Sequence, residues 1–239
     1  MITNEALRSL ATKLQTTELN VRREYFQHVF LSYFYQKSLT DRIYFKGGTA
    51  LRTLYTSPRF SEDLDFSSSL SDIHAIEEAL LETLASIARE NITPDLGEAK
   101  KTSGGYLAIV TFRTDQDVVA VQLEISLREG DKKGEAVTLV SDFVPAYTVV
   151  ALIREQLVEE KMQALLSRRK ARDFYDLYFI LRANLLPVQR KSVLSQVMEI
   201  IRESKIDFEK ELKEFLPRSH WAIIREFPTP LEREIERFL

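Results

Sequence analysis

A strand-to-helix junction carrying two adjacent glycines is the feature that most constrains how this chain can fold. Residues 43–45 are β-prone and residues 50–55 are compatible with a helix, so the glycines fall where a strand ends and a helix begins. Because glycine has no Cβ, the backbone amides of Gly47, Gly48 and Thr49 can approach an anion at the positive end of the helix dipole. We expect the Thr49 hydroxyl to cap this helix. The junction is a candidate phosphate cradle, although an ordinary capped turn also explains the glycine pair, which is weaker than a full P-loop pattern.

Two acidic residues follow this junction on a short predicted strand. Polar and apolar residues alternate over 63–67, so Asp63, Asp65 and Ser67 share one face while the residues between them enter the core. The two carboxylates then lie side by side, about 7 Å apart along the chain. Like charges repel unless a cation lies between them, and Mg²⁺ or Mn²⁺ suits carboxylates that leave room for phosphate oxygens and water. A solvated acidic turn is the alternative.

A predicted hairpin downstream offers a third carboxylate. Residues 105–113 and 118–127 are β-branched and apolar, and a turn-like segment separates them. Glu124 lies on the more polar face of the second strand. It is a metal-ligand candidate if the strand with Asp63 and Asp65 is its neighbour, and otherwise an exposed strand glutamate. A glycine cradle followed by paired carboxylates predicts a metal-dependent enzyme that acts on a nucleoside triphosphate.

Four short motifs carry a resemblance to a known family. Residues 46–51, 59–67, 161–168 and 172–178 resemble, in order and spacing, the motif series of AbiEii/AbiGii-type toxins. These are nucleotidyltransferase-like proteins of bacterial toxin–antitoxin and abortive-infection systems. One departure is Glu124, because such proteins often carry aspartate at the hairpin position. The longer side chain can still ligate a metal.

The resemblance implies an architecture and a set of partners. It implies an α/β fold with a nucleotidyltransferase-type mixed β-sheet core and flanking helices over residues 1–150. A helical C-terminal domain over residues 151–239 then completes the active site. An NTP substrate, Mg²⁺ or Mn²⁺ as the cofactor and a cognate antitoxin protein are implied as well.

Individual residues receive roles from the same resemblance. It assigns nucleotide binding to Gly47, Gly48, Thr49, Lys161 and Arg172, metal binding to Asp63 and Asp65, and catalysis to Asp63, Asp65, Lys161 and Asp176. Glu124 joins the metal ligands as the candidate from the hairpin. At about 100° per residue, Lys161, Arg172 and Asp176 share one stripe if residues 153–180 form one continuous helix. Lys161 can then neutralise triphosphate charge, Arg172 can grip phosphate oxygens, and Asp176 can orient either cation or act as a base. A solvated face with local ion pairs is the alternative.

The resemblance makes RNA, especially tRNA, the expected acceptor of the nucleotidyl group. Arg168, Arg169 and Lys170 form a basic run that can contact RNA, although a solvated helix end explains the run about as well. A small-molecule or protein acceptor stays open. A catalytically degenerate nucleotide-binding or antitoxin-interacting module is a further alternative, against which the intact pair of Asp63 and Asp65 weighs.

The composition limits these interpretations. A chain of 239 residues with 44% hydrophobic content can bury a sizeable core, and its net charge of −3 argues against a generally basic nucleic-acid binder. Cysteine is absent, which excludes disulfides and thiol catalysis, and the three histidines show no metal-ligand spacing. No apolar run reaches the length of a membrane span and no signal peptide opens the chain. We expect a cytoplasmic monomer without a membrane partner.

The hydrophobic patterns also predict the order of the elements. Helices are expected at residues 3–16, 18–38 and 71–90 and through most of the chain after residue 151, and strands at 43–45, 63–67, 105–113, 118–127 and near 137–150. The second helix is rich in aromatic residues and also carries His28, which we interpret as core residues.

Overall fold

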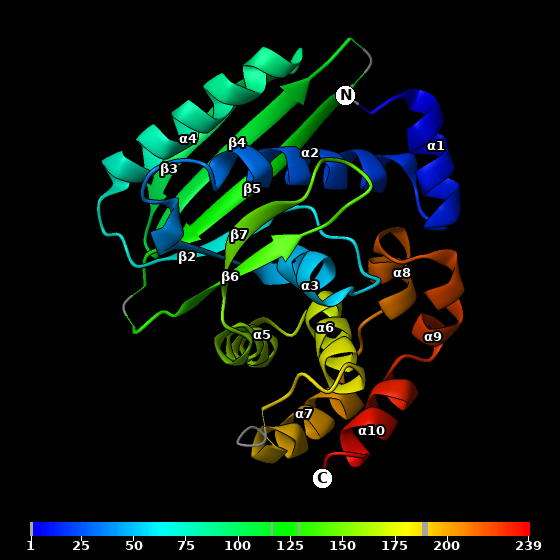
Figure 1. Cartoon of the computed structure of the whole chain (residues 1–239). Coiled ribbons are helices and arrows are strands. Elements are labelled where there is room, and N and C mark those ends of the chain that lie inside the picture. The colour runs from blue at the N-terminus through cyan, green and yellow to red at the C-terminus, as the bar shows by residue number, and fades with distance from the viewer. Residues whose placement is uncertain (1, 116, 129, 188–190) are drawn as a thin grey trace. The chain divides into compact units, whose positions relative to one another are not determined.

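The computed structural model describes residues 2–115, 117–128, 130–187 and 191–239. The chain divides into two compact units (Figure 1). Unit 1 comprises Met1–Thr56 and Phe60–Ile153, and unit 2 comprises Ser57–Arg59 and Arg154–Leu239. The short segment Ser57–Arg59 therefore belongs with the C-terminal helices although it precedes most of the sheet in sequence.

A mixed seven-stranded sheet forms the centre of unit 1 and confirms the predicted α/β fold class. The strands are β1 (Ile43–Lys46), β2 (Leu64–Ser68), β3 (Thr93–Thr102), β4 (Gly105–Arg113), β5 (Val118–Ser126), β6 (Gly134–Leu139) and β7 (Tyr147–Leu152). Their order across the sheet is β3-β4-β5-β2-β1-β7-β6. The pairs β2–β5 and β1–β7 are parallel, whereas the other neighbours are antiparallel. Strands β1 and β2 thus lie at the middle of the sheet.

The structure departs from the predicted strands at two places. The predicted strand near 137–150 is two antiparallel strands, β6 and β7, joined by a connection that contains Pro145. Strand β3 is not predicted, because its sequence is polar and charged. It lies at the edge of the sheet and pairs only with β4, where charged side chains are typical.

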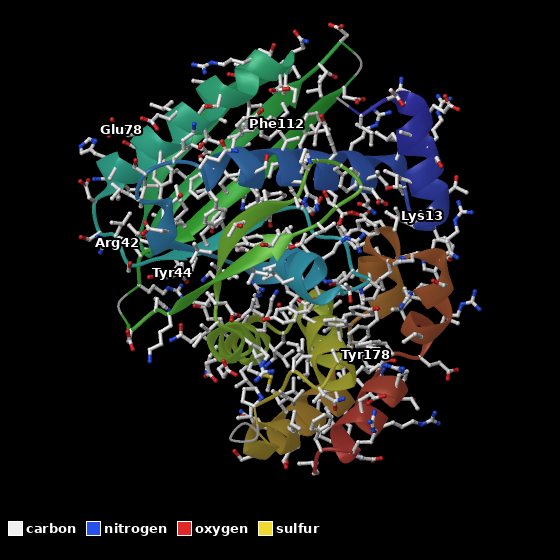
Figure 2. The ribbon with its side chains drawn as sticks, in the orientation of Figure 1. Lys13, Arg42, Tyr44, Glu78, Phe112 and Tyr178 are labelled. Carbon is white, nitrogen blue, oxygen red and sulfur yellow. The ribbon has the colours of Figure 1, made fainter. Side chains whose placement is uncertain are left out.

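Helices α1 (Asn4–Lys13), α2 (Glu18–Phe34), α3 (Gly47–Tyr55) and α4 (Ile73–Ile87) complete unit 1. The Thr17 hydroxyl accepts a hydrogen bond from Asn20 N at the start of α2. Helices α2 and α4 lie side by side against the sheet (Figure 1). Tyr25, Phe26, Phe30 and Phe34 of α2 are core residues, as predicted, whereas Tyr33 is only half-buried. Phe26 stacks at 5.1 Å between ring centroids on Phe112, which Figure 2 labels on β4.

His28 is a buried core histidine, with 4% of its surface exposed. Its Nδ1 lies 2.7 Å from the Tyr147 hydroxyl. Burial, reinforced by the positive charge of Arg52, lowers the pKa of His28 to about 4. The imidazole is therefore neutral in the folded protein at pH 7.

Unit 2 is helical. Its α-helices are α5 (Arg154–Arg168), α6 (Ala171–Arg182), α7 (Lys191–Glu203), α8 (Phe208–Leu212), α9 (Trp221–Arg225) and α10 (Pro228–Glu236). Phe227 is fully buried and packs against Tyr175 and Phe208, at centroid distances of 5.8 and 4.8 Å. Helix α6 thereby packs against the segments that end the chain. In the described parts of both units, no helix combines the length and the apolar character needed to cross a membrane.

The continuous helix expected over residues 153–180 is wrong. Helix α5 ends at Arg168, Arg169 adopts a left-handed backbone with φ of 52°, and Lys170 is extended. The Asp173 carboxylate accepts a hydrogen bond from Lys170 N at 3.2 Å, which caps the start of α6. Because the chain turns at Arg169, the residues on α5 and α6 do not form one helical stripe.

Candidate functional site

The glycine junction lies where strand β1 meets helix α3. Lys46 ends the strand and occupies the N-cap position without a side-chain capping bond. Gly47 has φ of 84°, a left-handed conformation that favours glycine. An ideal Cβ at Gly47 would lie 2.0 Å from Oδ2 of Asp65. Glycine is thus required at this position both by the backbone and by the close approach of the carboxylate.

Thr49 does not cap helix α3, contrary to the prediction. It is the third residue of the helix and is 1% exposed. Its hydroxyl donates a hydrogen bond of 2.6 Å to the backbone carbonyl of Asp63. The predicted cap fails because helix α3 begins at Gly47, two residues before Thr49. The Thr49 side chain instead joins the helix to the segment that carries the acids.

The acidic residues meet on the central strands of unit 1. Strand β2 begins at Leu64, so Asp63 lies one residue before it. Asp65 pairs with Lys46 of β1 on one side and with Glu124 of β5 on the other. Residues in register on neighbouring parallel strands point to the same face of a sheet. Glu124 is a metal-ligand candidate only if its strand lies beside the strand of Asp65. The pairing of β2 with β5 meets this condition.

The surroundings of these carboxylates differ. Asp65 is half-buried, and no described residue forms a hydrogen bond or an ion pair with its carboxylate. The exposed Glu124 accepts a hydrogen bond of 2.6 Å from the Gln122 side-chain amide on its own strand. No group of three or more histidine, aspartate or glutamate side chains is arranged to hold a metal ion among the residues described. A metal at this place would need further oxygen ligands, which Mg²⁺ takes from phosphates and water.

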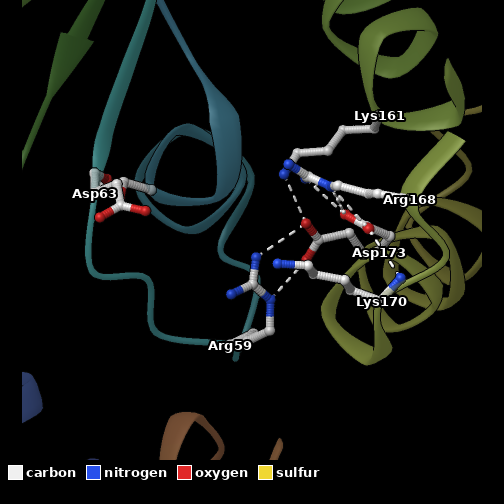
Figure 3. Close-up of polar contacts among 8 residues, drawn as sticks. Arg59, Asp63, Lys161, Arg168, Lys170 and Asp173 are labelled. Atoms are coloured by element: carbon white, nitrogen blue, oxygen red, sulfur yellow. Dashed lines mark hydrogen bonds and ion pairs between the residues drawn. The ribbon is translucent and has the colours of Figure 1, made fainter. Parts of the chain in front are cut away.

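A second polar cluster lies within unit 2 and is centred on Asp176 of helix α6. Arg59 binds the Asp176 carboxylate through two contacts of 2.7 and 2.9 Å, and Lys161 of helix α5 binds it at 2.7 Å (Figure 3). Asp176 is 1% exposed. Burial alone would raise the pKa of Asp176, but the charges of Arg59 and Lys161 lower it to about 2. The Asp176 carboxylate is therefore ionised and forms ion pairs with both cations.

Another ion pair connects the two helices around the turn at Arg169. Arg168 contacts both carboxylate oxygens of the fully buried Asp173, with a shortest distance of 2.7 Å (Figure 3). Arg169 and Lys170 are exposed. The Nε of Arg172 is buried and has no hydrogen-bond partner among the residues that the structure describes. In the predicted RNA-binding run of residues 168–170, Arg168 is therefore already paired with a carboxylate of helix α6.

The sequence profile of the family described as "Nucleotidyl transferase AbiEii toxin, Type IV TA system" matches residues 29–237. This match spans both units. The chain belongs to the AbiEii toxin family.

Solved structures show the same fold as this AbiEii protein at low sequence identity. JHP933 from Helicobacter pylori is 20% identical, with a TM-score of 0.66 over 93% of each chain. The MenT4 nucleotidyltransferase toxin of Mycobacterium tuberculosis is 18% identical, with a TM-score of 0.65 over all of this chain and 93% of its own. No curated protein matches the chain.

Membership of the family establishes the class of protein and of reaction. The AbiEii chain is an NTP-dependent nucleotidyltransferase of the toxin type, as the sequence motifs predicted. The type IV toxin–antitoxin classification implies an antitoxin partner. Nucleotidyltransferases generally use an NTP together with a divalent metal.

Two residues of this AbiEii chain, Arg59 and Gln27, form hydrogen bonds with the motif segments that the sequence does not predict. Arg59 lies within the predicted motif at 59–67, but only the fold shows that it pairs with Asp176. Gln27 is 2% exposed on helix α2 and bonds to the backbone just before Asp63. A glutamine between the aromatic residues of a helical segment is the available signal, because a buried amide requires hydrogen-bond partners.

Proposed function

We propose that this AbiEii toxin transfers a nucleotidyl group from a metal-bound NTP, with Asp63 and Asp65 as the metal ligands and Glu124 beside them. The observation that carries the proposal is the position of Asp65. Its carboxylate packs against Gly47 at the start of helix α3, in register with Glu124. Oxygen ligands of this kind suit Mg²⁺ or Mn²⁺, and such an ion, when bound, polarises the α-phosphate.

The first turn of α3 is the proposed site for the NTP phosphates. The amides of Gly47, Gly48 and Thr49 lie at the helix N-terminus, where free N–H groups and the helix dipole favour an anion. Lys46 leaves the helix without a side-chain cap, so no side-chain oxygen of the N-cap residue competes for these amides. The backbone here can bind phosphate while the adjacent Asp65 binds the metal.

In unit 2, we propose that Lys161 supplies positive charge to the triphosphate and that Asp176 positions the Lys161 side chain. The Asp176 carboxylate already binds Arg59 and Lys161 and has a pKa of about 2, which does not suit a general base. Arg172 is the second proposed phosphate-binding cation. In the described part of the chain its buried Nε has no hydrogen-bond partner, which agrees with a guanidinium kept for a ligand.

The proposed acceptor is RNA, and in particular tRNA, bound by an AbiEii monomer in the cytoplasm. A net charge of −3 means that RNA must be held by a local basic surface. The exposed residues Arg169 and Lys170 supply such charges, whereas Arg168 also binds Asp173. A small-molecule or protein acceptor predicts transfer that does not depend on these cations.

One labelling experiment tests the proposed reaction. The purified protein is incubated with each α-labelled NTP, Mg²⁺ and total RNA, and the labelled species is identified by electrophoresis. We expect label on an RNA of tRNA size, lost when EDTA is added and lost in the double variant Asp63→Asn, Asp65→Asn. Label on a protein or on a small molecule would show that this molecule, and not RNA, is the acceptor. Undiminished labelling by the double variant would refute the assigned site.

A further inference from the structure

Four consecutive residues that lead into strand β2 are each held by a side chain from helix α2 or α3. The segment 60–63 ends at Asp63, the first of the two proposed metal ligands. Strand pairing positions Asp65, but Asp63 precedes the first residue of β2. Something other than the ladder of strand hydrogen bonds must therefore fix the position of Asp63.

Gln27 of helix α2 makes the most direct of these contacts. Its side-chain Nε2 donates to the carbonyl of Ser61 at 3.0 Å and to the carbonyl of Glu62 at 3.1 Å. Both amide hydrogens are thereby used on the two peptide units that precede Asp63. Gln27 is 2% exposed and lies among the aromatic residues of α2. Burying an amide is destabilising unless it is hydrogen-bonded, so these two bonds account for the presence of Gln27 there.

The neighbouring residues of the segment are held in the same way. Thr49 of α3 donates to the Asp63 carbonyl at 2.6 Å. Arg23 of α2 forms an ion pair of 3.0 Å with the Glu62 carboxylate. The three carbonyls of residues 61–63 thus all accept hydrogen bonds from buried side chains, and the Glu62 side chain is anchored as well.

An arginine holds the start of the segment. The guanidinium of Arg52 lies 3.5 Å from the centre of the Phe60 ring. Glu24 of α2 binds the same guanidinium through two contacts of 2.6 and 3.0 Å. Residues 20, 24 and 27 of α2 are all buried polar positions, and two of these three side chains act on segment 60–63, directly or through Arg52.

We propose that Gln27 is a positioning residue for the Asp63 carboxylate and that helix α2 is in this way part of the active-site architecture. The proposal rests on the proposed function, in which Asp63 is a metal ligand. Gln27 itself touches no reacting atom. Its two hydrogen bonds fix the backbone from which Asp63 extends, as partners behind metal ligands commonly do.

The test measures binding of Mn²⁺ alone, by calorimetry, to the full chain and to the variant Gln27→Met. Methionine has a similar length and volume but cannot donate to the two carbonyls. We expect affinity for Mn²⁺ to fall about 10- to 100-fold. Nucleotidyl transfer by the variant should recover as Mn²⁺ is raised, which a general loss of structure would not allow.

Leu84→Ala is the matched control, since it removes a buried side chain from helix α4, which packs against α2 and β3 in the same unit. It should lower the melting temperature while leaving Mn²⁺ affinity unchanged. If Gln27→Met does not fold, Thr49→Val tests the same segment from α3, with the same expected loss of affinity.

Three results would contradict the proposal, and they are distinguishable. Wild-type affinity in Gln27→Met would overturn the role of Gln27 alone. Equal losses in Gln27→Met and Leu84→Ala would show a general loosening of unit 1 and would also overturn it. Wild-type affinity for Mn²⁺ in the double variant Asp63→Asn, Asp65→Asn would overturn the metal site, and the role of Gln27 with it.

Discussion

The Asp65 carboxylate occupies the space that a side chain at Gly47 would fill. An ideal Cβ on Gly47 would lie 2.0 Å from Asp65 Oδ2 and 2.6 Å from Asp65 Cβ. The end of β1 and the acid of β2 are therefore compatible only when residue 47 is glycine. This contact brings the proposed phosphate-binding backbone and the proposed metal ligand together within unit 1.

Gly47→Ala should consequently impair transfer more than stability. The new methyl group must displace Asp65, and a displacement of about 1 Å in an active site can reduce the rate about 100-fold. The left-handed backbone adds about 1 to 2 kcal/mol to the cost of folding. Gly97→Ala on strand β3 is the control, because its nearest neighbour would be a backbone oxygen at 3.9 Å. Rates of NTP-dependent labelling that are equal in the two variants would contradict this account.

Asp176→Asn should destabilise the protein strongly. The substitution leaves the buried guanidinium of Arg59 and the largely buried Lys161 without their shared carboxylate. Removing one partner of a buried ion pair costs about 3 to 5 kcal/mol of unfolding free energy. Glu209→Gln removes an exposed pair with Lys213 in the same unit and should cost about 1 kcal/mol or less. Urea denaturation measures the unfolding free energy of the two variants. Similar losses of unfolding free energy would show that the Asp176 ion pairs do not stabilise the fold.

His28 predicts a pH dependence of stability. The folded pKa of about 4 lies below the usual value of 6.5, so between these pH values only the unfolded chain binds the proton. Stability from His28 is fully present above pH 6.5 and is lost as the pH falls toward 4, at about 1.4 kcal/mol per pH unit.

Urea denaturation between pH 7 and pH 4.5 measures this effect. The variant His28→Gln lacks the titrating group, so its unfolding free energy should fall less steeply than that of the wild type. Parallel curves for the two proteins would show that His28 is protonated in the folded state at the usual pH.

RNA binding should depend on the exposed cations that follow helix α5. Arg169→Gln with Lys170→Gln removes two charges and keeps Arg168, which binds Asp173. The slope of log affinity against log salt should then decrease by about 1.4 to 1.8, the range from single-stranded to duplex nucleic acid. The control pair Lys205→Gln with Lys210→Gln removes two exposed charges elsewhere in unit 2. Identical salt slopes in the two double variants would place the RNA elsewhere.

The local motifs were predictable because they depend on neighbouring residues. Adjacent glycines between a β-prone and a helical segment predict the β1–α3 junction, and alternation over 63–67 predicts the strand of Asp65. Whether Glu124 lies beside Asp65 depends on the pairing of β2 with β5, which are far apart in the sequence. Only the fold decides that pairing, since either strand alone is compatible with several neighbours.

The errors have identifiable physical causes. Residues 168–172 consist of arginine, lysine and alanine, which are good helix formers, so periodicity predicts no interruption. The helix nevertheless ends at Arg168, because Asp173 caps a new helix and pairs with the last residue of the old one. The pairing of Arg59 depends on the fold alone. Its partner Asp176 lies 117 residues away, and no local pattern connects them.

The most direct test of the central claim is a crystal structure of the protein with Mn²⁺ and a non-transferable NTP analogue, in which anomalous scattering locates the metal. The account predicts Mn²⁺ at about 2.1 Å from carboxylate oxygens of Asp63 and Asp65, with phosphate oxygens on the amides of Gly47 and Gly48. Metal and phosphates bound away from these residues would contradict it.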